Sequence, residues 1–224
     1  MFTSNAQLRL WQLISPTLPV GAYAYSAGLE YGVDCGWIKN ESDASEWISG
    51  QLQHNLCTLD IPVLARLYQA WQTNDIDRVR TWNQFLLASR ESHELRTEDI
   101  HLGAALAQLL PELEIEEAAD WRAPEQASYA TLFALAAARW HIPLQDSAQG
   151  YLWAWCENQV AAAIKLIPLG QTAGQRIMSH ISQELTQAVD HGLSLNDEDI
   201  GALAPAVAIA SAKHETQYSR LFRS

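Results

Sequence analysis

Residues 143–168, PLQDSAQGYLWAWCENQVAAAIKLIP, carry the clearest structural signal in this sequence. Apolar side chains recur here at steps of four, four, three and four residues: Leu152, Cys156, Val160, Ala163 and Ile167. This spacing puts them on one face of an α-helix, because an α-helix completes a turn about every 3.6 residues. A proline stands at each end, where helices commonly start or stop. The segment predicts one long amphipathic helix.

The same helical period continues on both sides of this segment. Two further stripes repeat it: Ile177, Ile181, Leu185 and Ala188 after it, and Leu95, Leu102, Leu106 and Leu109 before it. No run alternates β-branched and polar residues between turn signals, so we expect no significant sheet. The sequence predicts an all-α fold, a helical bundle of about nine helices.

Prolines, glycines and capping residues predict where helices begin and end. Pro111 should end one helix, and Asp60, directly before Ile61-Pro62, is the expected N-cap of another. Gly192 is expected to close a third helix. No Gly/Ser-rich or strongly charged linker divides the chain, so residues 1–224 are predicted to form a single domain.

The composition excludes several classes of protein. The 224 residues include 14 Lys and Arg against 26 Asp and Glu, a net charge of -12, which disfavours nucleic-acid binding. Nine Trp and 48% hydrophobic residues disfavour intrinsic disorder. The N-terminus has no secretory pattern, and no apolar run approaches the ~18 residues that a membrane span needs. We expect a cytoplasmic protein that does not associate with membranes.

The common motifs of nucleotide, zinc and acyl chemistry are missing. The segment at 170–175, GQTAGQ, lacks the Lys and the Ser or Thr of a phosphate-binding loop. The segment at 214–218, HETQY, has Tyr218 where a zinc protease has its second His. No G-x-S-x-G sequence is present. We expect no catalytic, cofactor or metal site, and no enzyme activity.

Residues 90–101 concentrate charged side chains. If they are helical, Glu91, Glu94, Glu98 and His101 share one face. Glu98 and His101 form an E-x-x-H pair of the kind that di-metal bundles use, but the second E-x-x-H that such bundles require does not occur in the chain. Three interpretations stay open: a protein interface, which is favoured, a solvated face with local pairs such as Arg90–Glu94, and a metal site.

Lys165 lies near the predicted end of the helix in residues 143–168. Its aliphatic stem can pack on apolar neighbours while the ammonium group reaches water and interacts with the helix dipole. The alternative is a cation presented to an acidic partner.

Two terminal segments have the composition of contact surfaces. Residues 15–30, SPTLPVGAYAYSAGLE, interrupt the helical pattern with prolines and glycines and place tyrosines between small residues. Residues 218–224, YSRLFRS, are aromatic and basic in an otherwise acidic protein. Terminal residues usually fray unless they dock, so we expect a tail at 215–224 that is flexible alone and ordered by a partner.

Four segments in order, spanning the whole chain, resemble the urease accessory protein F (UreF) family. They are 13–30, LISPTLPVGAYAYSAGLE; 89–103, SRESHELRTEDIHLG; 158–175, NQVAAAIKLIPLGQTAGQ; and 214–224, HETQYSRLFRS. One departure is mild: Ala22-Tyr23 stands where the family commonly has Gly-Phe after Pro-Val-Gly.

The resemblance implies an all-helical, non-enzymatic assembly factor that forms a homodimer in the cytoplasm. Proteins of this family bind UreD/UreH, recruit the nickel-carrying GTPase UreG and dock on apo-urease, so that the nickel site can be filled. They are also thought to regulate GTP hydrolysis by UreG. The alternatives are a helical metal-dependent enzyme that uses the Glu98 region, and a dimeric scaffold unrelated to urease.

The resemblance also implies which residues contact each partner. Those expected to bind UreD/UreH are Tyr23, Tyr218, Arg220, Leu221, Phe222 and Arg223. Those expected to face UreG are Glu30, Arg90, Glu94, Arg96, Lys165 and Gln171. A hydrogen bond from the Arg220 guanidinium to the Tyr23 hydroxyl oxygen is expected to couple the N-terminal segment to the tail.

Overall fold

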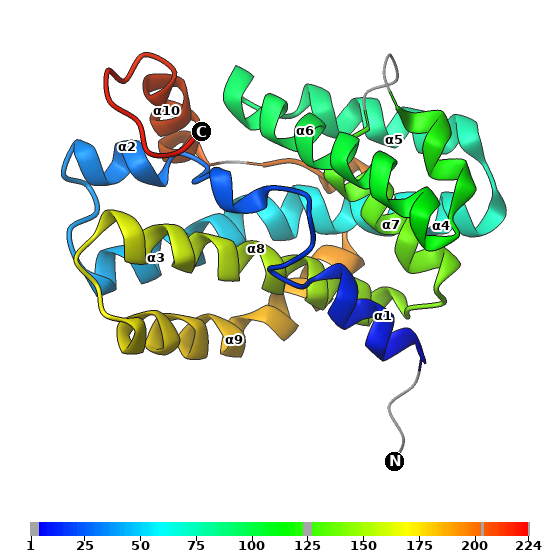
Figure 1. The fold of residues 1–224 in the computed structure, drawn as a ribbon, viewed down its shortest axis with the longest axis horizontal. Coiled ribbons are helices and arrows are strands. Elements are labelled where there is room, and N and C mark those ends of the chain that lie inside the picture. Colours follow the sequence, from blue (N-terminus) through cyan, green and yellow to red (C-terminus); the bar gives the residue numbers. More distant parts are fainter. Residues whose placement is uncertain (1–4, 123–126, 203, 224) are drawn as a thin grey trace.

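The computed structural model describes residues 5–122, 127–202 and 204–223, and none of these residues forms a strand. The α-helices in these ranges are α1 (Asn5–Leu13), α2 (Leu29–Asp34), α3 (Glu41–Gln51), α4 (Ile61–Thr73), α5 (Ile76–Ala88), α6 (His93–Leu109), α7 (Tyr129–Arg139), α8 (Leu144–Leu166), α9 (Gln171–Ser194) and α10 (Pro205–His214). The shorter helical elements are η1 (Ala22–Ala24), η2 (Leu52–Asp60), η3 (Leu110–Leu113), η4 (Glu116–Trp121) and η5 (Asp197–Asp199). The predicted all-α class is confirmed (Figure 1).

The helix predicted from residues 143–168 is α8, and it lies in the middle of the molecule (Figure 1). All five members of its predicted stripe are buried, and so are the four of the stripe on α9, which packs along α8. Removing this apolar surface from water is the main favourable contribution to folding. The predicted proline boundaries are also confirmed: α8 begins directly after Pro143, and α6 ends two residues before Pro111.

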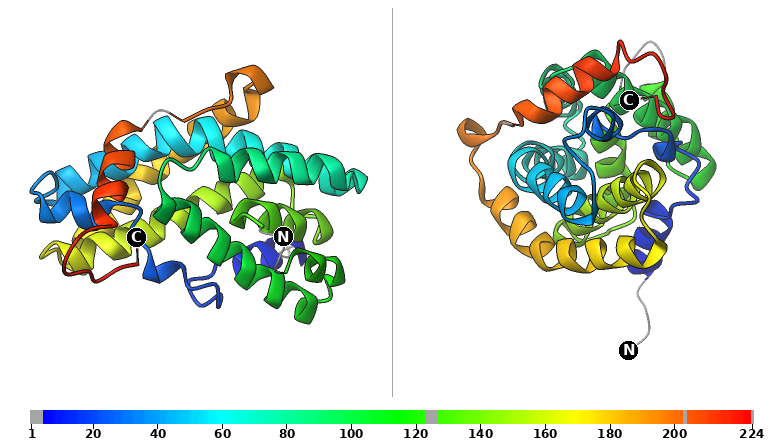
Figure 2. Two further views of the ribbon diagram at one scale, coloured as in Figure 1. Left: turned by 90° about the horizontal axis from the view of Figure 1, so that it is seen from above. Right: turned by 90° about the vertical axis from the view of Figure 1, so that its left-hand side faces the viewer.

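Helix α3, the π-helical η2 and α4 follow one another as one continuous rod (Figure 2). Asp60 has helical backbone angles (φ −66°, ψ −46°) and makes no capping bond, so the prediction that it is an N-cap was wrong. The rod begins at Asn40, whose side chain accepts a hydrogen bond from the Asp43 N–H. Pro62 has no N–H to donate to the Thr58 carbonyl four residues earlier. The Gly201 N–H donates to that oxygen instead, at 3.0 Å.

The prediction that Gly192 closes a helix was wrong, because α9 continues to Ser194. The lack of a side chain at Gly192 serves packing instead. A Cβ at Gly192 would lie 2.5 Å from the Cys57 carbonyl oxygen and 2.8 Å from Ile61 Cγ2. The backbone of α9 can therefore approach the rod more closely than any residue with a Cβ would allow.

Helix α10 and the segment after it pack beside α2, at one end of the molecule (Figure 1). Gly28 precedes α2 with φ +81°, a conformation that suits glycine. A Cβ there would lie 3.1 Å from both Ala210 Cβ and the Ser211 backbone nitrogen. Among the described residues, no helix combines the length and apolar character that crossing a membrane requires.

The contact at Gly192 predicts opposite effects for two glycine substitutions. Gly192→Ala should lower the free energy of unfolding by about 1–3 kcal/mol, because the new methyl group meets backbone of the rod that cannot move aside. Gly50→Ala, within α3 and with nothing within 4 Å of the added Cβ, should raise it by about 0.5–1 kcal/mol through helix propensity. Urea unfolding of both variants measures the difference, and equal effects would contradict this description of the packing.

Candidate partner-binding site

The N-terminal loop (residues 14–28), α2, α6 and α10 meet around the tail, defined here as residues 215–223 (Figure 1). The tail crosses back over the loop, and the Arg223 N–H donates to the Ala24 carbonyl at 2.8 Å. Two segments almost 200 residues apart in sequence thus lie side by side.

One carboxylate holds the backbone of the tail. Glu30, in the first turn of α2, is 6% exposed. Its Oε1 accepts the Leu221 N–H at 2.6 Å, and its Oε2 accepts the Phe222 N–H at 2.8 Å. Hydrogen bonds to an ionised acceptor are stronger than neutral ones, so two of them fix this part of the tail.

His214 links that carboxylate to a second one. The ring is fully buried; Nε2 lies 3.1 Å from Glu30 Oε2, and Nδ1 lies 2.8 Å from Glu94 Oε2. Glu94 Oε1 accepts from Arg220 Nη1 at 2.9 Å. Both nitrogens of the ring therefore lie within hydrogen-bonding distance of a carboxylate oxygen. We call Glu30, Glu94, His214 and Arg220 the tail cluster.

Further contacts seat the tail on either side of this cluster. Phe222 is 6% exposed, and Lys165 Nζ lies 5.5 Å from the centre of its ring, a cation–π distance. Glu215 Oε1 accepts the His93 N–H at 3.1 Å at the start of α6. In this structure the tail is docked on its own chain. That residues 215–224 are flexible without a partner stays a prediction.

The residues expected to bind UreD/UreH gather around the loop and the tail. Tyr23 is 69% exposed, Leu221 is 66% exposed, and Tyr218 and Arg223 are also exposed. Phe222 instead faces inward and anchors the tail. The described contact of the Arg220 guanidinium is with Glu94, and no Tyr23–Arg220 bond is found among the described residues.

The residues expected to face UreG divide into two groups. Arg96, Lys165 and Gln171 are exposed. Glu30 and Glu94 are buried in the tail cluster, so in this conformation they act on the tail and not directly on a partner.

Arg90 is also removed from the surface. Its side chain is 13% exposed and lies between two buried carboxylates. Nη1 and Nη2 donate to Asp60 at 3.0 and 2.7 Å, and Nε donates to Asp99 at 2.9 Å. The Tyr151 hydroxyl adds a third donor to Asp60 at 3.0 Å. The predicted Arg90–Glu94 pair within a helix was wrong, because α6 begins only at His93.

Burial and neighbouring charges have opposite effects on the pKa values of Asp99 and Arg90. Burial raises the pKa of Asp99, while the positive charge of Arg90 and the hydrogen bond from the Tyr129 N–H lower it. The carboxylates in turn hold the pKa of Arg90 well above its ordinary value, although burial alone would lower it. The network needs all three charged groups, because removing one leaves another buried charge without compensation.

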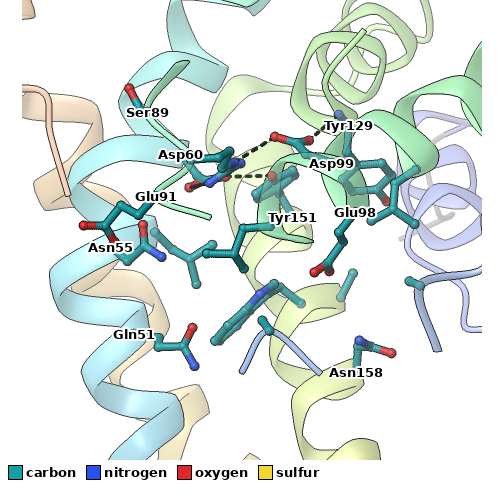
Figure 3. A pocket seen from close by; sticks show the side chains of 18 residues that line it. Gln51, Asn55, Asp60, Ser89, Glu91, Glu98, Asp99, Tyr129, Tyr151 and Asn158 are labelled. Atoms are coloured by element: carbon teal, nitrogen blue, oxygen red, sulfur yellow. Dashed lines mark hydrogen bonds and ion pairs between the residues drawn. The ribbon is translucent and has the colours of Figure 1, made fainter. Parts of the chain in front are cut away.

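A cavity of about 110 Å³ opens beside this network (Figure 3). Residues from the N-terminal loop, α3, η2, the connection between α5 and α6, α6, α7 and α8 line it, including Glu91 and Glu98. His101, the partner of Glu98 in the E-x-x-H pair, turns instead to the Tyr25 hydroxyl, 2.8 Å from its Nδ1. Within the described ranges, no three His, Cys, Asp or Glu side chains are grouped so that they could hold a metal ion.

Comparison with known protein sequences shows which family the chain belongs to. A sequence model of the UreF family matches residues 38–182. The chain belongs to the UreF family. It is 58% identical over 219 residues to a protein of Alkalilimnicola ehrlichii named urease accessory protein UreF. That alignment covers 98% of this chain and 96% of the relative. Proteins of the same name from Alcanivorax borkumensis and Teredinibacter turnerae are each 48% identical and cover 99% of this chain and 99% and 100% of their own lengths.

UreF membership confirms the family resemblance and the expectation that this is an accessory protein and not an enzyme. It also removes the alternative of a scaffold unrelated to this family. The family model itself covers neither the N-terminal loop nor the tail, but the full-length relatives align across both.

Arg90→Met should destabilise the protein by about 3–5 kcal/mol, because it leaves Asp60 and Asp99 buried without their guanidinium. Without Arg90 the pKa of Asp99 rises further above that of the unfolded chain, so the folded state binds more protons. Stability of the variant should therefore be greatest at low pH and fall as the pH rises through that pKa. Urea unfolding at about pH 5 and about pH 8 measures this.

The control is Arg176→Met, which breaks an exposed ion pair with Glu41 and should change stability little at either pH. A similar, pH-independent loss in both variants would contradict the role assigned to the buried network.

Glu30→Gln should release the tail while leaving the helices folded. The amide has one acceptor oxygen, so it cannot accept from both Leu221 and Phe222 and also face His214. Losing one charge-assisted bond should speed hydrogen exchange in residues 215–223 about tenfold or more. Asp34→Asn, an exposed charge loss on the same helix, is the control and should leave exchange in the tail unchanged.

Proposed function

We propose that this UreF-family protein is a urease accessory protein of the cytoplasm that bridges UreD/UreH and the GTPase UreG on apo-urease, and so supports insertion of nickel into the urease active site. The observation that carries the proposal is the surface built by the N-terminal loop and the docked tail. The names of the relatives support the link to urease. The absence of a phosphate-binding loop in the sequence agrees with GTP hydrolysis by UreG.

The surface for UreD/UreH is proposed to be the loop and the tail together. Tyr23, Tyr218 and Leu221 expose large apolar side chains here, and aromatic residues are enriched in the cores of protein interfaces. Arg220 and Arg223 add positive charge to a protein that is acidic as a whole. Because the Arg223 N–H binds the Ala24 carbonyl, both parts of this surface are presented in one fixed arrangement.

The surface for UreG is proposed to include Arg96, Lys165 and Gln171, which are exposed. Arg90, Glu30 and Glu94 are proposed to act on it indirectly, Arg90 through the buried network and the two glutamates through the tail cluster. Binding at this surface is also proposed to regulate GTP hydrolysis. The functional unit is proposed to be a homodimer.

The first test is size-exclusion chromatography with light scattering, on this protein alone and mixed with UreD/UreH and UreG. A dimer that joins both partners in a stoichiometric complex is expected. Arg220→Ala, or removal of residues 215–224, should abolish binding of UreD/UreH and leave the helical circular-dichroism spectrum unchanged. Recovery of UreD/UreH with the truncated protein at wild-type levels would contradict the assignment of the tail.

Two charge reversals separate the UreG surface from the tail. Arg96→Glu should weaken recruitment of UreG without changing hydrogen exchange in residues 215–223, because Arg96 is exposed on α6. Lys165→Glu should weaken recruitment and also speed that exchange, because it removes the cation over the Phe222 ring. Wild-type recruitment by both variants would remove these residues from the proposed surface.

A further inference from the structure

The cavity of about 110 Å³ beside the buried network has a strongly acidic lining (Figure 3). Among the described residues, the carboxylates of Asp60, Glu91, Glu98 and Asp99 line it, and the guanidinium of Arg90 lies with them. A partly enclosed site of one charge sign concentrates the field of its side chains. The cavity therefore favours a positively charged group and disfavours an anion.

A buried amide nitrogen in the same cavity has no hydrogen-bond partner among the described residues. Gln51 is 3% exposed, and no hydrogen-bonding atom of the described residues reaches its Nε2. Figure 3 shows the carboxamide extending from α3 toward the cavity. The oxygen and nitrogen of an amide exchange places when the group turns over, so Gln51 can offer either an acceptor or a donor to a group that enters. Buried polar groups in native proteins are usually hydrogen-bonded, so a group that enters the cavity can supply the partner that the protein does not.

The remaining walls are apolar and suit a hydrocarbon chain. Leu56, Leu95, Leu102 and the indole of Trp155 surround the space between the polar groups. A metal ion does not fit this lining, because no three ligating side chains in the described part of the chain are grouped to hold one. A cationic head on an aliphatic stem fits both parts, and that is the chemistry of an arginine or lysine side chain.

The cavity adjoins the surface proposed to bind a partner. Ala22 lines the cavity, and its neighbour in sequence is the exposed Tyr23. The wall formed by the N-terminal loop is held by Asn158, whose Nδ2 donates to the Tyr25 carbonyl at 3.1 Å, and by the Arg223 N–H on the Ala24 carbonyl. A partner on the loop and tail therefore contacts the segment that forms one wall of the cavity.

We propose that this cavity receives an arginine or lysine side chain of the protein that docks on the loop and tail. The inference rests on the proposed function for the identity of that partner. The head of the side chain lies among the carboxylates and Gln51, and its stem packs on Trp155 and the leucines. Docking of the tail, which holds one wall of the cavity through Ala24, favours this insertion.

The first experiment uses butylguanidinium, a guanidinium on a short aliphatic stem, and its neutral analogue butylurea. Titration of the full chain with butylguanidinium should shift the indole N–H resonance of Trp155 in a saturable way, with the resonance assigned from Trp155→Phe. Butylurea should give no saturable shift. The double variant Glu91→Gln, Glu98→Gln should bind butylguanidinium about tenfold more weakly. Its control, Glu112→Gln, Glu116→Gln, makes the same change of charge at two exposed sites and should bind like the wild type.

The second experiment measures the affinity of the same variants for UreD/UreH. The cavity double variant should bind about tenfold more weakly at unchanged thermal stability, and the control should bind normally. Equal butylguanidinium binding by the wild type and the cavity variant, or equal affinity of both for UreD/UreH, would overturn the proposal. Failure of the proposed function has a different signature, because the wild type itself would then form no complex, and the assignment of the occupant would fall with it.

Discussion

The arrangement of this protein depends on one buried guanidinium. Arg90 joins Asp60 of the long rod to Asp99 of α6, and these carboxylates extend the connection to two more helices. Asp99 accepts the Tyr129 N–H at the start of α7, and Asp60 accepts the Tyr151 hydroxyl from α8. Charges removed from water are costly unless each is paired, so the four helices can pack here only in the arrangement that completes the pairing.

Helix α6 carries this constraint to the surface. Along its length Glu94 holds His214 and Arg220, Asp99 holds Arg90, and Glu98 lines the acidic cavity between them. A displacement of α6 would therefore alter the tail cluster and the cavity together. This gives a physical route by which events at the tail reach residues in the interior, through one rigid element and not through a chain of loose contacts.

The sequence predicted the helices well and the site only in outline. Apolar periodicity identified α8 and α9, because the buried face of a helix appears as a regular spacing of apolar residues within one short segment. Pairings between distant residues leave no such period: Glu30 meets Phe222, and Asp60 meets Arg90. Spacing along the chain therefore predicted an Arg90–Glu94 pair and an N-cap at Asp60, and both predictions were wrong. The close approach at Gly192 was equally invisible, because the rod that it contacts is more than 130 residues away.

The structure also changes how the two proposed partner surfaces relate to one another. Glu30 and Glu94 were expected to contact UreG, yet their described bonds hold the tail, whose exposed residues are proposed to bind UreD/UreH. Lys165 belongs to both surfaces, because it is exposed and lies over the ring of Phe222. On the proposed assignment, free energy gained when UreD/UreH orders the tail also acts on the surface proposed for UreG, and linkage requires the reverse as well. The proposed binding of the two partners is then coupled through the tail cluster, and substitutions there are expected to affect both.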